Sequence, residues 1–100
     1  MNDFKWLISW FQKHCDGDWE HTYGISIGTL DNPGWRISIS LEETELEEKK
    51  FKRLKIERSD DNWIHCFIKE KCFEIACRVL NFEEGIRLFR EWAEKCQNED

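Results

Sequence analysis

The sequence predicts a single α+β domain with a five-stranded, largely antiparallel sheet. Apolar residues recur at helical spacing near both ends of the chain and alternate at period two between them. The chain has 100 residues, a length typical of one domain, and it contains no internal repeat. Residues 1–100 are therefore expected to fold as one domain.

The first helix is expected directly after Asp3, which can cap its N-terminus. Apolar residues follow at positions 4, 7, 8 and 11, and Trp6 and Trp10 widen this apolar face. The helix is expected to end near His14, because residues 16–18 (Asp-Gly-Asp) are a turn signal.

Five strands are expected between the two helices. The first two form a hairpin around the turn at Asp31–Gly34, and a charged connector, Glu42–Lys50, precedes the third. The predicted strands are Thr22–Leu30, Trp35–Leu41, Lys52–Glu57, Trp63–Lys69 and Cys72–Val79. Their connections are short, which favours an antiparallel meander.

The last helix is expected to begin after Asn81 as its N-cap, with Glu84 completing a capping box. Both helices must bury an apolar face, and the apolar side of the sheet is available to them. We therefore expect both helices on one face of the sheet. The predicted core contains Phe4, Leu7, Phe11, Ile37, Ile39, Ile56, Ile86 and Phe89.

The charge balance is acidic, with a net charge of -6. Phosphate contacts need clustered Lys and Arg, so nucleic-acid binding is not expected. The one basic run, Lys49–Lys55, follows the acidic run Glu42–Glu48, which would neutralise it. An acidic protein suits a basic partner, although solubility alone also explains the charge.

The N-terminus shows no basic segment followed by an apolar run, and no stretch has the length of a membrane span. A cytoplasmic protein that does not bind membranes is therefore expected. The five cysteines are an odd number at irregular spacing. In a reducing compartment they are expected to be free thiols.

The densest polar cluster lies between the first helix and the first strand. Asp16, Asp18, Glu20 and His21 could serve acid–base chemistry or a metal site. The same segment is also a good turn. Because no nucleophile motif, phosphate loop or paired zinc ligands accompany it, no catalytic residue, metal or cofactor is expected.

The six tryptophans divide into two groups. Five fall on apolar faces and are expected in the core: Trp6, Trp10, Trp35, Trp63 and Trp92. Trp19 instead stands between two acidic residues in the predicted turn. It either plugs the edge of the sheet or serves as an exposed anchor for a partner.

Several segments resemble the immunity protein 53 family of bacterial polymorphic toxin systems. They are Asp16–His21, Tyr23–Ile25, Thr29–Trp35, Asn62–Trp63 and Phe89–Trp92. The resemblance spans nearly the whole chain and implies a non-enzymatic protein that binds the toxic domain of a cognate toxin. The acidic charge suits a basic toxin such as a nuclease, because opposite charges speed encounter.

The expected toxin-binding surface combines the segment at 16–21 with the turn at 31–35. Its candidate residues are Asp16, Asp18, Trp19, Glu20, His21, Asp31, Asn32 and Trp35. The two segments flank opposite ends of one predicted strand, so a shared surface must run along that strand. Three alternatives stay open: both segments are only conformational turns, the acidic cluster belongs to a small enzyme or metal-binding protein, or the chain is a general protein-interaction domain.

Overall fold

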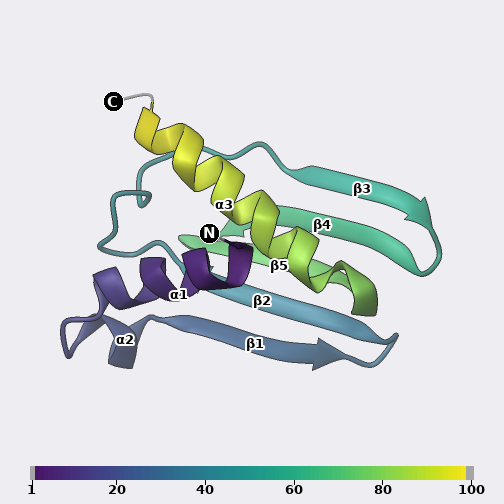
Figure 1. Ribbon diagram of the computed structural model, residues 1–100, viewed down its shortest axis with the longest axis horizontal. Helices are drawn as coiled ribbons and strands as arrows, with labels where there is room; N and C mark the ends of the chain where they lie inside the picture. The colour runs from purple at the N-terminus through teal and green to yellow at the C-terminus, as the bar shows by residue number, and fades with distance from the viewer. Residues whose placement is uncertain (1, 99–100) are drawn as a thin grey trace.

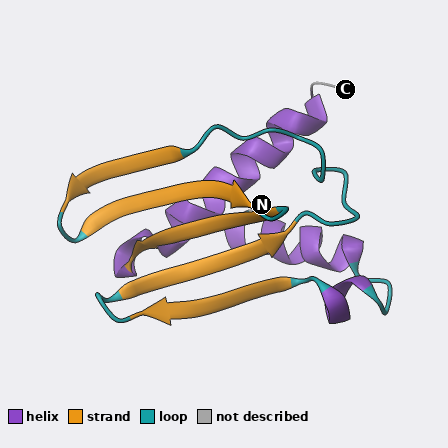
Figure 2. Ribbon diagram, turned by 180° about the vertical axis from the view of Figure 1, so that it is seen from behind, coloured by secondary structure: helices purple, strands orange, loops and turns teal. Residues whose placement is uncertain are grey.

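The computed structural model describes residues 2–98 and shows one five-stranded sheet with its two long helices on a single face (Figures 1 and 2). The elements in chain order are α1 (Asp3–His14), α2 (Trp19–Thr22), β1 (Ile25–Leu30), β2 (Gly34–Ser40), β3 (Leu54–Ser59), β4 (Asn62–Lys69), β5 (Cys72–Arg78), a 3-10 turn (Val79–Asn81) and α3 (Phe82–Asn98). The predicted fold class and the placement of both terminal helices on one face are confirmed. The opposite face of the sheet is open (Figure 2).

All neighbouring strands pair antiparallel, but the order is β1-β2-β5-β4-β3, so the expected meander is wrong. The connector after β2 carries the chain to the far edge of the sheet and leaves β2 to pair with β5. Two connector side chains, Leu41 and Leu46, are fully buried. The Leu41 N–H also donates to the Lys71 carbonyl at 2.8 Å. These contacts fix the path of the connector.

Asp3 does not cap α1. The cap is Asn2, whose side chain accepts from the Lys5 N–H at 2.8 Å. Asp3 is the first helical residue, and its buried carboxylate accepts from Arg87 at 3.0 Å and from Arg90 at 3.4 Å. Asp3, the residue predicted as the cap, therefore forms ion pairs that link α1 to α3.

The hydrophobic core centres on Phe89, whose ring lies 5.0 Å from that of Phe73 and 5.3 Å from that of Trp10. Of the predicted core residues, the fully buried or nearly buried ones are Leu7, Ile37, Ile39, Ile86 and Phe89, whereas Phe11 and Ile56 are partly buried against the core. The prediction for Phe4 is wrong. Its side chain lies at the rim between the helices, stacked on Phe82 at 5.5 Å and 39% exposed.

The tryptophans do not follow the expected division. Trp10 and Trp92 are buried, and Trp6 and Trp35 pack partly buried against the core. Trp63 is an exception. Successive side chains of β4 point to opposite faces of the sheet, and because the next residue, Ile64, is buried under the helices, Trp63 lies on the open face. The core position predicted for Trp63 is therefore wrong.

The junction between β5 and α3 differs in detail from the prediction. β5 ends at Arg78, and Asn81 closes a 3-10 turn before α3. The side-chain amide of Asn81 donates to Asn62 at 3.0 Å, while its Oδ1 accepts no hydrogen bond. The carboxylate of Glu84 pairs with Arg58 at 2.6 Å. The predicted capping box is thus replaced by contacts with β3 and β4.

Within residues 2–98, no helix is both long and apolar enough to cross a membrane. All five cysteines are free thiols in the structure. Burial raises the pKa of Cys66 to about 12 and that of Cys77 to about 11. These two thiols are therefore protonated core groups rather than reactive ones.

Candidate partner-binding surface

The acidic segment after α1 is held by its own carboxylates. One oxygen of Asp16 accepts from the backbone N–H groups of Asp18 and Trp19, both at 2.9 Å. The Glu20 carboxylate accepts from the N–H groups of Asp16 at 2.9 Å and Gly17 at 2.8 Å. Asp16 therefore caps backbone amides of its own turn.

These hydrogen bonds stabilise the charged carboxylates. The N–H groups of Trp19 and Asp18 lower the pKa of Asp16, and backbone N–H groups, first its own and then those of Asp16 and Gly17, lower the pKa of Glu20. The turn leads into α2, a short helix that the sequence did not indicate. Both acids therefore remain ionised and shape the backbone.

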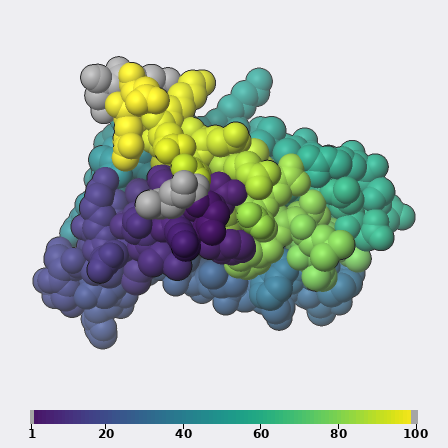
Figure 3. All heavy atoms as spheres, viewed as in Figure 1, coloured from purple at the N-terminus to yellow at the C-terminus, as the bar shows by residue number. Residues whose placement is uncertain are grey.

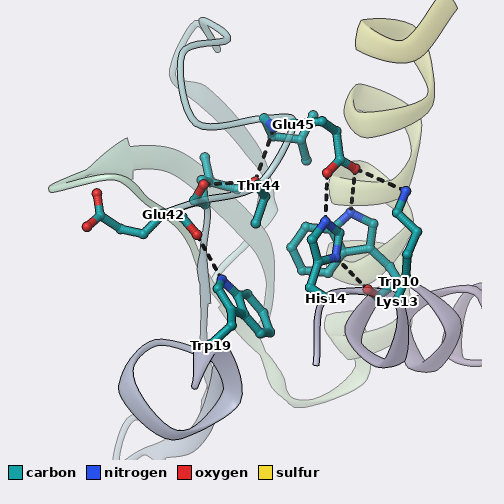
Figure 4. Close-up of polar contacts among 9 residues, drawn as sticks. Trp10, Lys13, His14, Trp19, Glu42, Thr44 and Glu45 are labelled. Atoms are coloured by element: carbon teal, nitrogen blue, oxygen red, sulfur yellow. Dashed lines mark hydrogen bonds and ion pairs between the residues drawn. The ribbon is translucent and has the colours of Figure 1, made fainter. Parts of the chain in front are cut away.

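Trp19 is 3% exposed, so its interpretation as an exposed anchor is wrong. Its ring packs against those of Phe11 and Trp10, at 5.8 and 5.9 Å. Its indole Nε1 donates to the carbonyl of Glu42 at 2.8 Å (Figure 4). Trp19 fills the space between α1, α2 and the connector, so it is a core residue rather than a plug of the sheet edge.

A second polar cluster, which sequence reasoning missed, joins α1 to the connector (Figure 4). The Glu45 carboxylate accepts from Nε2 of His14 at 2.6 Å, from Nε1 of Trp10 at 3.3 Å and from Nζ of Lys13 at 3.4 Å. Nδ1 of His14 donates to the Trp10 carbonyl at 2.7 Å. Both ring nitrogens of His14 thus lie within hydrogen-bond distance of an oxygen atom.

No pattern in the sequence distinguishes Glu45 from the other acids of the connector. Burial alone would raise its pKa, but the hydrogen bond from His14 and the charges of His14 and Lys13 outweigh burial and lower it. The cluster thus holds an ionised acid against the end of α1. It is a structural clasp, because the three side chains that contact the Glu45 carboxylate all belong to α1.

The turn at 31–35 closes the β1–β2 hairpin. The Asn32–Pro33 peptide bond is cis, and Asp31 and Asn32 are exposed. Trp35 is partly buried against Phe82, with 4.9 Å between ring centroids, and its Nε1 donates to the Val79 carbonyl at 3.0 Å. Trp35 therefore packs β2 against the start of α3.

The candidate residues divide by what their side chains do. Asp18, His21, Asp31 and Asn32 are exposed and hold no backbone turn in place. Asp16 and Glu20 are exposed too but hold the turn before α2, and Trp19 and Trp35 pack against other rings of the fold. The two segments lie at opposite ends of β1 (Figure 1). Among residues 2–98, no three His, Cys, Asp or Glu side chains are grouped to hold a metal ion.

The comparisons with known proteins identify the family. No curated protein and no solved structure matches the chain. The family model described as immunity protein 53 matches residues 4–94, which includes both candidate segments and all five strands. The chain therefore belongs to the immunity protein 53 family.

Proposed function

We propose that this protein binds the toxic domain of a cognate bacterial toxin in the cytoplasm of the producing cell and neutralises it without catalysis. The observation that carries the proposal is the family match over residues 4–94. The hydrogen bonding of the acidic segment supports the absence of catalysis in this proposal, because the Asp16 and Glu20 carboxylates are engaged with backbone amides.

The charge of the protein favours a basic toxin such as a nuclease. The chain carries a net charge of -6, and opposite charges raise the rate of encounter. Asp18 and His21 at one end of β1 and Asp31 and Asn32 at the other are the side chains that we assign to toxin contact. Asp16 and Glu20 add to the negative field while they hold the turn.

The test is protection of cells by the intact protein. The toxin domain encoded beside this gene is expressed from an inducible promoter, with and without this protein. We expect survival only when both are present, and a stable complex when the two are purified together. Equal killing in both strains, together with no complex in vitro, would contradict the proposed function.

A further inference from the structure

The two edges of the sheet differ in how they are guarded against further pairing. β3 carries Lys55, Glu57 and Arg58, and its register shifts between Glu57 and Ser59. Charges and bulges of this kind block edge-to-edge association. β1 (Ile-Ser-Ile-Gly-Thr-Leu) contains neither a charged residue nor a proline, and within residues 2–98 no strand pairs with its outer side. β1 is thus an unguarded edge.

The pairing of β1 with β2 shows which backbone groups point outward. The Ser40 N–H donates to the Gly24 carbonyl at 3.1 Å, which makes these two residues a hydrogen-bonded pair. Hydrogen-bonded and non-hydrogen-bonded pairs alternate along an antiparallel ladder. The register continues from this pair to Ile25 with Ile39, so the alternation makes residues 26 and 28 the ones whose backbone groups hydrogen-bond to β2. Residues 25, 27 and 29 therefore direct their N–H and C=O groups away from the sheet.

An apolar groove lies beside this edge on the helix side of the sheet. It is lined by Leu7, Ile8 and Phe11 of α1 and by Ile25 and Ile27 of β1. Ile8 is 64% exposed and Ile27 is 49% exposed, although both are large apolar side chains. The blue spheres of the β1–β2 hairpin form the lower border of the molecule beyond α1 (Figure 3). A strand added at β1 would direct alternate side chains into the groove.

We propose that the toxin domain docks by adding an extended segment to the outer edge of β1. This inference rests on the proposed function and assigns the surface that performs it. Only an extended backbone satisfies the outward N–H and C=O groups of residues 25, 27 and 29, and apolar side chains at every second position fill the groove. The recognised element is therefore a strand with alternating apolar residues.

The charges at both ends of β1 indicate which charges the added toxin segment carries. Acidic side chains bracket β1: Asp16, Asp18 and Glu20 precede it, and Asp31 follows it. A segment with an uncharged centre and basic flanks complements this arrangement. A second copy of this chain fits less well, because antiparallel self-pairing about a two-fold axis brings the acidic end of one β1 beside Asp31 of the other.

Amide hydrogen exchange on the wild-type protein, with and without the purified toxin domain, tests the proposal without any substitution. In the free protein the amides of Ile27 and Thr29 are expected to exchange fast and those of Ser26 and Gly28 slowly. In the complex the two fast amides slow by about tenfold or more, while Ser26 and Gly28 change little. Slowing confined to alternate residues is the signature of an added strand.

Other outcomes separate the failure of this inference from that of the proposed function. If a complex forms while Ile27 and Thr29 still exchange fast, the docking site is elsewhere and only this inference fails. If they are slow in the free protein and its mass in solution is that of a dimer, a second copy occupies the edge and the inference is overturned. If no complex forms and cells are not protected, the proposed function itself fails.

A pair of lysine substitutions on β1 provides a matched comparison. Ile27→Lys places a charge in the groove, whereas Ser26→Lys adds the same charge on the same strand but on the open face. We expect Ile27→Lys to raise the dissociation constant by about tenfold or more and Ser26→Lys to change it much less. Equal effects would show that net charge alone matters and would contradict docking at the groove. Both sites are exposed, and circular dichroism checks that both variants fold.

Discussion

Nε2 of His14 lies 2.6 Å from Oε2 of Glu45, and this contact joins the last turn of α1 to the connector between β2 and β3. The connector also buries Leu46 and receives the indole N–H of Trp19 at the Glu42 carbonyl. The acidic connector is thereby tied to the helix layer. The clasp makes the stability of the protein depend on the ionisation of Glu45.

Glu45→Gln tests that dependence on pH. The pKa of Glu45 is lowered from 4.5 in the folded protein, so the unfolded chain takes up its proton first as pH falls. The stabilisation is fully present above pH 4.5 and is lost as pH falls through the folded-state pKa. In urea unfolding, we expect the variant to be less stable at neutral pH and to lose less stability in acid than the wild type. Glu48→Gln, at an exposed position of the same connector, is the control. Its free energy of unfolding should change with pH as that of the wild type does.

Phe89→Ala tests the centre of the core. Phe89 is fully buried among the rings of Trp10, Phe73 and Trp92. Its truncation leaves a cavity and is expected to lower the free energy of unfolding by about 3–5 kcal/mol. The exposed Ile8→Ala should change it by less than about 0.5 kcal/mol. Comparable losses in the two variants would contradict the assignment of the core.

Gly34→Ala tests the close approach of β2 to β5. A Cβ at Gly34 would lie 2.2 Å from the carbonyl oxygen of Cys77, and that oxygen belongs to the backbone and cannot rotate away. Overpacking here is expected to destabilise the protein by about 1–3 kcal/mol in chemical denaturation. Gly28→Ala is the matched control on the neighbouring strand, because no atom lies within 4 Å of its Cβ position. A neutral Gly34→Ala would mean that the two strands separate easily.

Thiol titration tests the state of the cysteines. Under denaturing conditions without reductant, five thiols are expected in freshly lysed material, as all five are free in the structure. In the native protein Cys66, Cys77 and Cys96 should react slowly because they are buried, so the partly exposed Cys15 and Cys72 react first. A reproducible count of three or one in the denatured protein would contradict the expected reducing compartment.

Charge reversal at the acidic segment separates steering from folding. Asp18→Lys is expected to slow association with the toxin domain several-fold at low salt and less at high salt, with no change in melting temperature. Glu20→Lys should lower the melting temperature, because the Glu20 carboxylate holds the N–H groups of Asp16 and Gly17. Stopped-flow association and thermal unfolding measure the two effects. If the Asp18 variant associates at the wild-type rate at low salt, this segment is not part of the interface.

Most local elements of this protein follow from the amino-acid pattern alone. Periodicity placed the two long helices and all five strands within a few residues, because the alternation of apolar side chains depends only on the backbone period of each element. Residues 37, 39, 86 and 89 entered the core for the same reason. The short helix α2 gave no such pattern. The family resemblance also needed only the sequence, and the match over residues 4–94 confirms it.

Features that depend on distant partners could be seen only in the folded chain. Local pattern could not show that β5 inserts between β2 and β4, because strand order depends on where the buried Leu41 and Leu46 carry the connector. Trp19 stands between two acids in the sequence, yet rings from α1 bury it. Burial is a property of the neighbours that a fold brings together, and for Trp19 those neighbours lie in other elements of the chain.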